Sequence, residues 1–149
     1  KNFEKIKFHK IKFDIIIMSG LISYFDNIKI PIFKSLNLLK KQNSKIYIFN
    51  RFNKYNIDTI IRYKINNTSG YQKGLNSFSK NTVRQVLKNK KVKINFSKFN
   101  IPIVIKKSNN LVNSFTIVTN KKEKILCNKA NIIADHYLLE ISKRFEKNF

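Results

Sequence analysis

Apolar residues in the first half of the chain fall into short groups separated by polar breaks, and their spacing predicts a mixture of helices and strands. Asp14 stands at an N-cap position before the apolar group Ile15 to Phe25, which predicts a buried helix. Pro31 has no N–H to donate, so the group around it predicts a strand near a sheet edge. After the first helix we expect this edge strand, a second helix and two further strands, over residues 28–32, 33–39, 45–49 and 57–65.

The second half of the chain reads as mostly β. Residues 66–74 are rich in Asn, Thr, Ser and Gly and are the best candidate for a domain boundary. Beyond them we expect strands and one short helix (128–134), with the strands over residues 75–78, 83–87, 92–96, 101–105, 115–118, 124–126 and 137–141. The expectation is an α+β fold of two small lobes, the N-terminal one α-β-α-β-β and the C-terminal one mostly antiparallel β with short helices. The expected divisions are a basic N-terminal arm, an α/β domain and a β-rich domain, over residues 1–13, 14–68 and 69–149.

Charge changes this picture more than any other property of the sequence. The chain has 31 Lys and Arg against 8 Asp and Glu in 149 residues, a net charge of +23. Positive charges at this density repel one another, which opposes a compact fold unless a polyanion offsets the repulsion. Nucleic acid is the obvious polyanion. Nearly all the basic residues are lysines, which favours contact with a phosphate backbone over reading of base edges. The alternating stretch Lys5 to Phe13 fits an arm on RNA and a lysine-protected edge strand equally well.

Residues for catalysis or metal binding are sparse. Cys127, Asp135 and His136 are the only trio that could resemble a cysteine nucleophile with its base, and a small buried Cys beside a loop His explains them more simply. One Cys and two His do not make a metal site, and three Gly form no phosphate-binding loop. The longest apolar run is too short to span a bilayer. The sequence therefore predicts no enzyme, no catalytic residue, no metal, no cofactor, no membrane and no small-molecule substrate.

Three stretches, in the same order along the chain, carry a resemblance to a known family. They are Ile30 to Leu36 with its continuation to Ile46, Ser79 to Val86, and Ile117 to Lys121 with its continuation to Ala130. They resemble the S-eight family of small-subunit ribosomal proteins, whose signature is close to Ile-Ser-Thr-Ser-Lys. Departures include Val118 for the first Ser of that signature and an extra segment at about residues 89–107. On these stretches the chain is identified as a divergent organellar member.

The resemblance implies a structural protein that binds the central domain of small-subunit rRNA, supports its assembly and contacts neighbouring small-subunit ribosomal proteins. A loop of short polar side chains would enter the RNA minor groove, where hydroxyls and amides can bond the 2′-hydroxyls. Basic residues on a facing loop and strand would contact phosphates. The rRNA-binding residues that it implies are Lys34, Ser79, Lys80, Arg84, Thr119, Asn120, Lys121, His136 and Tyr137.

Two other functions stay open from the sequence. The first alternative is a free-standing basic RNA-binding accessory factor, which would fold without rRNA. A basic peripheral membrane protein comes third, because no long amphipathic helix with a lysine face is visible. The basic charge, the divergence from the family pattern and a composition rich in Lys, Asn and Ile point to a mitochondrial ribosome. A plastid or a reduced bacterial ribosome is the alternative.

Overall fold

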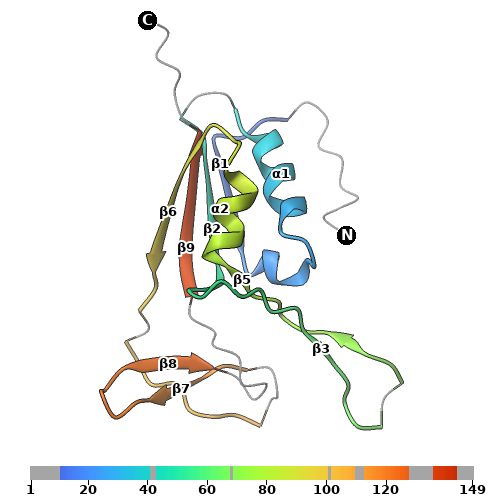
Figure 1. The fold of residues 1–149 in the computed structure, drawn as a ribbon, viewed down its shortest axis with the longest axis vertical. Helices are drawn as coiled ribbons and strands as arrows, with labels where there is room; N and C mark the ends of the chain where they lie inside the picture. The colour runs from blue at the N-terminus through green and yellow to red at the C-terminus, as the bar shows by residue number, and fades with distance from the viewer. Residues whose placement is uncertain are drawn as a thin grey trace, which may run out of the picture.

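The computed structural model describes residues 11–40, 43–67, 69–100, 102–109, 113–127 and 136–143. The described elements begin with a strand, a 3-10 helix and an α-helix, then four strands precede the second α-helix, and four more strands follow it (Figure 1). The helical elements are the 3-10 helix η2 (Leu21–Tyr24), α1 (Lys29–Leu38) and α2 (Lys80–Leu87). The strands are β1 (Ile15–Ser19), β2 (Lys45–Asn53), β3 (Arg62–Tyr63), β4 (Gln72–Lys73), β5 (Phe78–Ser79), β6 (Val92–Lys98), β7 (Phe115–Val118), β8 (Lys124–Cys127) and β9 (His136–Lys143).

A five-stranded mixed sheet forms the centre of the molecule. Its strand order is β1-β2-β9-β6, and β5 pairs with the end of β2. Strands β1 and β2 are parallel, whereas β9 is antiparallel to both β2 and β6. It follows that β1, β2 and β6 all point the same way, and their carboxyl ends lie at one edge of the sheet. Two smaller two-stranded sheets, β3-β4 and β7-β8, project near that edge (Figure 1).

Both α-helices cover the same face of this sheet. One row of paired residues crosses all four strands of the main path, namely Met18, Ile48, Leu139 and Phe96. At one end of the row, Ser35 of α1 lies 3.5 Å from the sulfur of Met18. At the other end, the Lys80 ammonium of α2 lies 5.6 Å from the centre of the Phe96 ring. Paired residues point to the same side of a sheet, so α1 and α2 pack side by side on one face.

The core lies between this face and the helices. Ile48 and Leu139 are fully buried, and Ile32 of α1 and Val83 of α2 complete the same cluster. The opposite face carries no helix among the described residues. Ile17, which points to that face, is 74% exposed, and Ile15 is 56% exposed.

Two of the predicted elements near the N-terminus are wrong. Residues 15–25 are not a helix but strand β1 followed by η2, and Gly20 separates the two with a positive φ of 66°. Consecutive β-branched residues favour a strand, and β1 gains a full parallel ladder with β2. Residues 28–32 are not a strand, because Pro31 lies in the first turn of α1. Its missing N–H costs nothing at that position, where the helix has no acceptor for it.

Later elements are partly confirmed. The predicted strand over residues 83–87 is wrong, since α2 begins where the side chain of Ser79 caps the Thr82 N–H at 2.9 Å. Residues 102–105 form no strand. Of the predicted strand 57–65, Arg62–Tyr63 is a strand and Thr59 forms an isolated β-bridge with Ser77. The predicted helix over 128–134 and most of the N-terminal arm lie outside the described residues. Confirmed are the helix over 33–39, as part of α1 up to Leu38, and strands within or over residues 45–49, 92–96, 115–118, 124–126 and 137–141.

The α+β character of the prediction is confirmed in its coarse form, as a multi-stranded sheet with two helices. The sheet takes strands from both sides of residue 68, the predicted boundary, because β2 pairs with β9 along seven residues. The connection from β6 to β9 carries the hairpin of β7 and β8.

Candidate functional site

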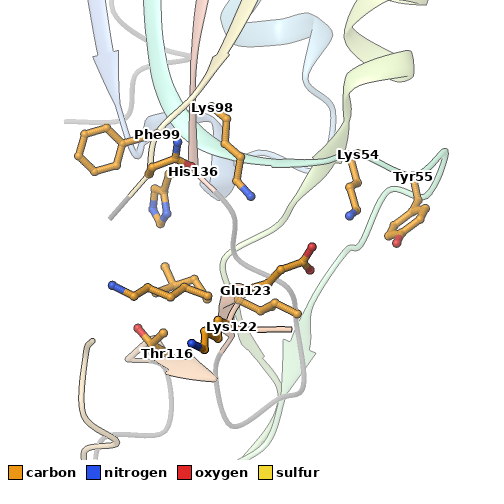
Figure 2. A pocket seen from close by; sticks show the side chains of 12 residues that line it. Lys54, Tyr55, Lys98, Phe99, Thr116, Lys122, Glu123 and His136 are labelled. Atoms are coloured by element: carbon orange, nitrogen blue, oxygen red, sulfur yellow. The ribbon is translucent and has the colours of Figure 1, made fainter. Parts of the chain in front are cut away.

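A pocket of about 500 Å³ lies at the sheet edge where β2 and β6 end and β9 begins (Figure 2). Its volume falls within the range typical of sites for small molecules. In open α/β sheets, ligands bind outside the carboxyl ends of the parallel strands, and this pocket lies at that edge. The sheet side of its lining consists of Lys54, Tyr55, Lys98, Phe99, Asn100 and His136. The other side is built by the β7-β8 hairpin, with Thr116, Lys122, Glu123, Lys124, Ile125 and Leu126.

His136, the first residue of β9, is held in place by aromatic neighbours. Its ring stacks on Phe49 with 5.3 Å between ring centres and an angle of 25° between the planes. Phe99 meets Phe49 edge-on at 5.3 Å and donates its backbone N–H to the His136 carbonyl at 2.9 Å. These contacts fix the imidazole on the face of the sheet away from the helices, at the wall of the pocket.

A tight turn between β7 and β8 forms the opposite wall. Thr119 closes it with three hydrogen bonds: its N–H donates to the Glu123 carbonyl at 2.9 Å, its carbonyl accepts from Lys122 N–H at 2.8 Å, and its hydroxyl accepts from Glu123 N–H at 3.1 Å. Lys122 has a left-handed backbone with φ of 60°. This turn brings Lys122, Glu123 and Lys124 together on the pocket wall.

The pocket is strongly basic. Four lysines, Lys54, Lys98, Lys122 and Lys124, line it against one acid, Glu123. The ion pairs among the described residues include none of Lys54, Lys122 and Lys124. A concave surface lined by one sign of charge focuses the electric field, so this pocket attracts anions.

Arg51 lies beside His136 on the neighbouring strand β2. It is the Cα partner of His136 in the β2-β9 ladder, and it is only 9% exposed. Its Nη2 donates to the Ser114 hydroxyl at 3.1 Å, whereas its buried Nη1 has no hydrogen-bond partner among the described residues. Burial lowers the pKa of Arg51, yet a guanidinium stays charged in proteins. None of the ion pairs within the described part of the chain gives this charge a carboxylate.

The residues implied by the ribosomal resemblance do not converge on one surface. Of the nine, His136 alone lines the pocket, and Thr119, Asn120 and Lys121 lie at the adjoining turn of the hairpin. Tyr137 points to the opposite face, where the Lys80 ammonium lies 3.8 Å from its ring centre. The others are Lys34 on α1, Ser79 as the buried N-cap of α2, and Arg84 exposed on α2. Contact of these residues with RNA stays a prediction.

The sequence reasoning missed most of the pocket. Lys54, Tyr55, Lys98 and Phe99 follow or end two strands that were predicted correctly, so the positions after those strands were the available signal. The residues that follow two strands lie close together only if the strands run in the same direction. This signal therefore also requires the two strands to be parallel. Arg51 had no such signal, since a basic residue in a strand is ordinary in so basic a chain.

Other kinds of site find no support among the described residues. They contain no group of three or more His, Cys, Asp and Glu that could hold a metal ion. Cys127 is buried, and burial raises the pKa of its thiol, which disfavours the thiolate that a nucleophile needs. Asp135, the third member of the trio considered from the sequence, lies outside the described residues. No described helix is both long enough and apolar enough to cross a bilayer.

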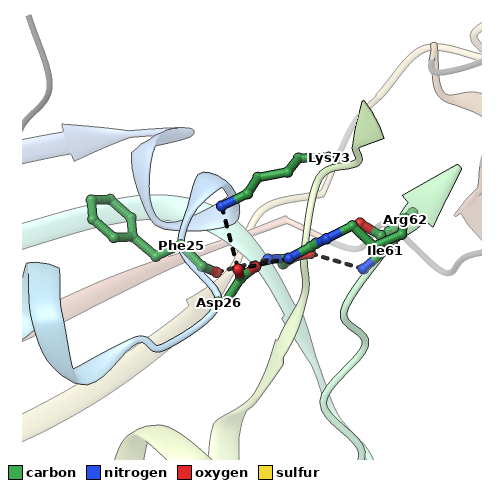
Figure 3. Close-up of polar contacts among 6 residues, drawn as sticks. Phe25, Asp26, Ile61, Arg62 and Lys73 are labelled. Atoms are coloured by element: carbon green, nitrogen blue, oxygen red, sulfur yellow. Dashed lines mark hydrogen bonds and ion pairs between the residues drawn. The ribbon is translucent and has the colours of Figure 1, made fainter. Parts of the chain in front are cut away.

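A second polar cluster joins the β3-β4 hairpin to the body of the molecule (Figure 3). Asp26 accepts hydrogen bonds from Arg62 at 2.6 Å, Asn76 at 3.1 Å and Lys73 at 3.3 Å. Arg62 and Lys73 are Cα partners in this hairpin. The Arg62 guanidinium, with Asn76 and Lys73, lowers the pKa of Asp26 to about 2. Arg62, Lys73 and Asn76 all direct hydrogen bonds to Asp26, so the cluster tethers the hairpin to the body of the molecule.

Asp26→Asn should loosen this tether. The amide cannot pair with Arg62 and Lys73, so we expect several-fold faster hydrogen exchange of the Gly74 N–H, which bonds the Ile61 carbonyl at the hairpin base. Because the folded-state pKa lies below the ordinary 3.8, the contribution is complete above about pH 4 and is lost as the pH falls through about 2. NMR titration of the Asp26 carboxyl checks the pKa. Asp14→Asn removes another exposed ion pair, with Lys40, and should leave Gly74 unchanged; equal effects of both variants would contradict the tether.

Comparison with known proteins bears on the fold. Neither a protein-family model nor a curated protein matches this sequence. A similar solved structure is that of a SAM-dependent methyltransferase from Methanosarcina mazei, with a TM-score of 0.54 and 13% sequence identity. The likeness covers 98% of this chain and 66% of the methyltransferase, so the chain spans just under two thirds of that protein's length. At this identity the likeness shows a shared fold.

This fold overturns the resemblance to the S-eight ribosomal family. The predicted role as a structural constituent of the small ribosomal subunit, with rRNA and ribosomal proteins as partners, is therefore wrong, and the RNA-binding accessory factor is not supported either. The stretches that carried the resemblance fall in other elements: Ser79 to Val86 is a helix with its cap, and Thr119 to Lys121 is the turn of a separate hairpin. The predictions of no enzyme and no small-molecule substrate also conflict with a methyltransferase fold. The described chain is similar in fold to a SAM-dependent methyltransferase.

Proposed function

We propose that this chain forms the acceptor side of a methyltransferase that uses S-adenosylmethionine. The observation that carries the proposal is the position of the pocket. It lies at the carboxyl edge of β2 and β6, in a sheet that shares its fold with a SAM-dependent methyltransferase. The acceptor is the molecule that receives the methyl group, and the pocket has the volume for a small one.

The methyl donor does not fit this pocket. S-adenosylmethionine carries a sulfonium and an ammonium against one carboxylate, so its net charge is positive, and four lysines against Glu123 repel it. The sequence also has no glycine-rich loop for a nucleotide, since its glycines stand only at positions 20, 70 and 74. The described residues therefore serve the acceptor, and no residue of this pocket is assigned to the donor.

The sheet topology agrees with a donor site elsewhere. Nucleotides bind open α/β sheets at the point where the connecting helices change from one face to the other. In the described sheet α1 and α2 lie on the same face, so no such point exists within it. The outer edge of β1 has no neighbouring strand among the described residues. The donor site is expected beyond this edge.

In this proposal the chain's own residues bind and orient the acceptor. His136 and Phe99 offer ring surfaces whose positions are fixed by Phe49. The β7-β8 hairpin forms the second wall and limits the access of water to the bound molecule. Such positioning lowers the barrier of a transfer between two bound molecules, because the entropy of bringing them together is lost on binding.

The test measures methyl transfer by the protein purified, with an affinity tag, from the cells that naturally produce it. It is incubated with methyl-tritiated S-adenosylmethionine and fractions of small molecules from those cells. We expect label in one fraction, and a drop in kcat/KM of about tenfold or more in His136→Ala. Leu138→Ala, on the same strand and face but outside the pocket, should transfer label normally. No transfer to any fraction, or no effect of His136→Ala, would refute the proposal.

The division into an arm (1–13), an α/β domain (14–68) and a β-rich domain (69–149) is untested and stays a proposal. The pocket supports a close association of the latter two, since its lining comes from β2 and its turn as well as from the hairpin. An organellar, mitochondrial location also stays a proposal, and its only support is the composition of the chain.

A further inference from the structure

We propose that the pocket selects an acceptor that bears a carboxylate or phosphate group on a small apolar body. This inference rests on the proposed function, because it names the substrate class of the same site. Three features of the described residues carry it: the lysines that line the pocket, the charge of Arg51 beside His136, which no described carboxylate compensates, and the aromatic and aliphatic surfaces of the lining.

The lysines of the wall come from three separate segments that meet only in the folded chain. Lys54 follows β2, Lys98 ends β6, and Lys122 and Lys124 flank the start of β8. Like charges that converge on a cavity repel one another, and an anion bound between them relieves that repulsion. Lysine runs elsewhere, such as Lys106 and Lys107, do not line this pocket. The convergence distinguishes the pocket from the general basic surface of the chain.

Arg51 adds a charge that no carboxylate among the described residues neutralises. A buried charge without a partner is costly, and such groups in proteins are normally paired. Its Nη1, which has no hydrogen-bond partner among the described residues, is covered, so the ligand does not touch it in this conformation. The guanidinium instead acts through space, since the low dielectric between Arg51 and the pocket screens its charge less than water would. An anion beside its ladder partner His136 offsets this charge.

The rest of the lining is suited to an organic molecule. Tyr55 and Phe99 are more than half exposed, at 55% and 51%, and both line the pocket. Ile125 and Leu126 of β8 add aliphatic surface on the other wall. A free inorganic ion would leave these surfaces in water, whereas a ring or short aliphatic chain covers them and gains from their burial. The favoured ligand is therefore a small organic anion.

The test uses phenyl phosphate, benzoate and neutral benzyl alcohol as probes, with binding measured by isothermal titration calorimetry at fixed ionic strength. We expect either anion to bind at least about tenfold more tightly than benzyl alcohol. Comparing the affinity for phenyl phosphate with the affinity for benzoate then shows whether the pocket prefers a phosphate or a carboxylate. Lys98→Glu should weaken the binding of the preferred anion by about tenfold, while Lys93→Glu, on the same strand but outside the pocket, should not.

A second pair of variants tests the inference even if Lys98→Glu does not fold. Lys122→Gln lies on the pocket wall and should weaken binding several-fold, whereas the adjacent Lys121→Gln should not. Equal effects within each pair, or equal affinity for anion and alcohol, would overturn the inference and leave a diffuse basic surface. These measurements need no methyl donor. Anion binding without methyl transfer would therefore refute the proposed function alone, and methyl transfer without anion preference would refute this inference alone.

Discussion

Leu139→Ala is expected to lower the free energy of unfolding by about 2–5 kcal/mol, the range for a leucine truncated in a packed core. Leu139 is fully buried at the middle of β9, the strand that joins β2 to β6. Its ladder partners are Ile48 and Phe96, so the cavity would open in the centre of the helix-covered face. Urea unfolding followed by circular dichroism measures the loss, with an unchanged m-value as the sign that the folded state stays compact.

Leu138→Ala is the matched control, because it makes the same change one residue earlier on the opposite face. Leu138 is 39% exposed, and no described helix covers it. We expect it to cost less than about 1 kcal/mol. Similar losses in both variants would mean that the second face of the sheet is also packed, and would contradict a core confined to the side of α1 and α2.

The strands that could be predicted are those whose pattern is decisive. In β2, the residues from Lys45 to Phe49 alternate a buried isoleucine with a less buried neighbour, as expected for a strand with one covered face. In β6, buried Val92 and half-buried Ile94 and Phe96 likewise alternate with exposed Lys93 and Asn95. β-Branched and aromatic residues in these segments reinforce the period of two. Local pattern was enough wherever it agreed with the tertiary packing.

Prediction failed where the pattern was ambiguous or where a cap was overlooked. A continuous apolar run such as Ile15 to Met18 has no period, so periodicity alone cannot separate a buried helix from a strand. Parallel pairing with β2 decided it. In the other direction, Ser79 is a favourable N-cap residue for α2, but the apolar residues Val83 and Val86 were read as a strand.

The candidate site was harder to predict from the sequence than the strands. Arg51 and His136 become neighbours only through the β2-β9 register, and they lie in opposite halves of the chain. The lysines of the pocket are chemically identical to many others in this sequence. A composition so uniform in charge hides the few cations that converge, and only the strand order shows which ones they are. The same uniformity made short ribosomal matches easy to find.

Arg51→Met should raise the free energy of unfolding of the ligand-free chain by about 1–3 kcal/mol. Methionine fills a similar volume without a charge, and replacing a poorly compensated buried charge by an apolar side chain is often stabilising. Within the described part of the chain, the hydrogen bond from Nη2 to Ser114 offsets only part of the desolvation cost of the guanidinium. The same variant should lose most of the stabilisation that phenyl phosphate gives to the wild-type chain, which thermal unfolding over a ligand series measures.

Two controls separate the charge of Arg51 from its shape. Arg51→Lys keeps the positive charge but lacks the planar guanidinium. The anion should therefore still stabilise this variant, whereas the ligand-free variant should be no more stable than the wild type. Arg84→Met makes the same substitution on the exposed side of α2, where the guanidinium only packs over Phe96, and should change stability by less than about 1 kcal/mol. If Arg51→Met instead destabilises the free chain while the anion response persists, the guanidinium serves the packing of β2 against the hairpin. Its charge would then play no part in the pocket, and the anion preference would rest on the lysines alone.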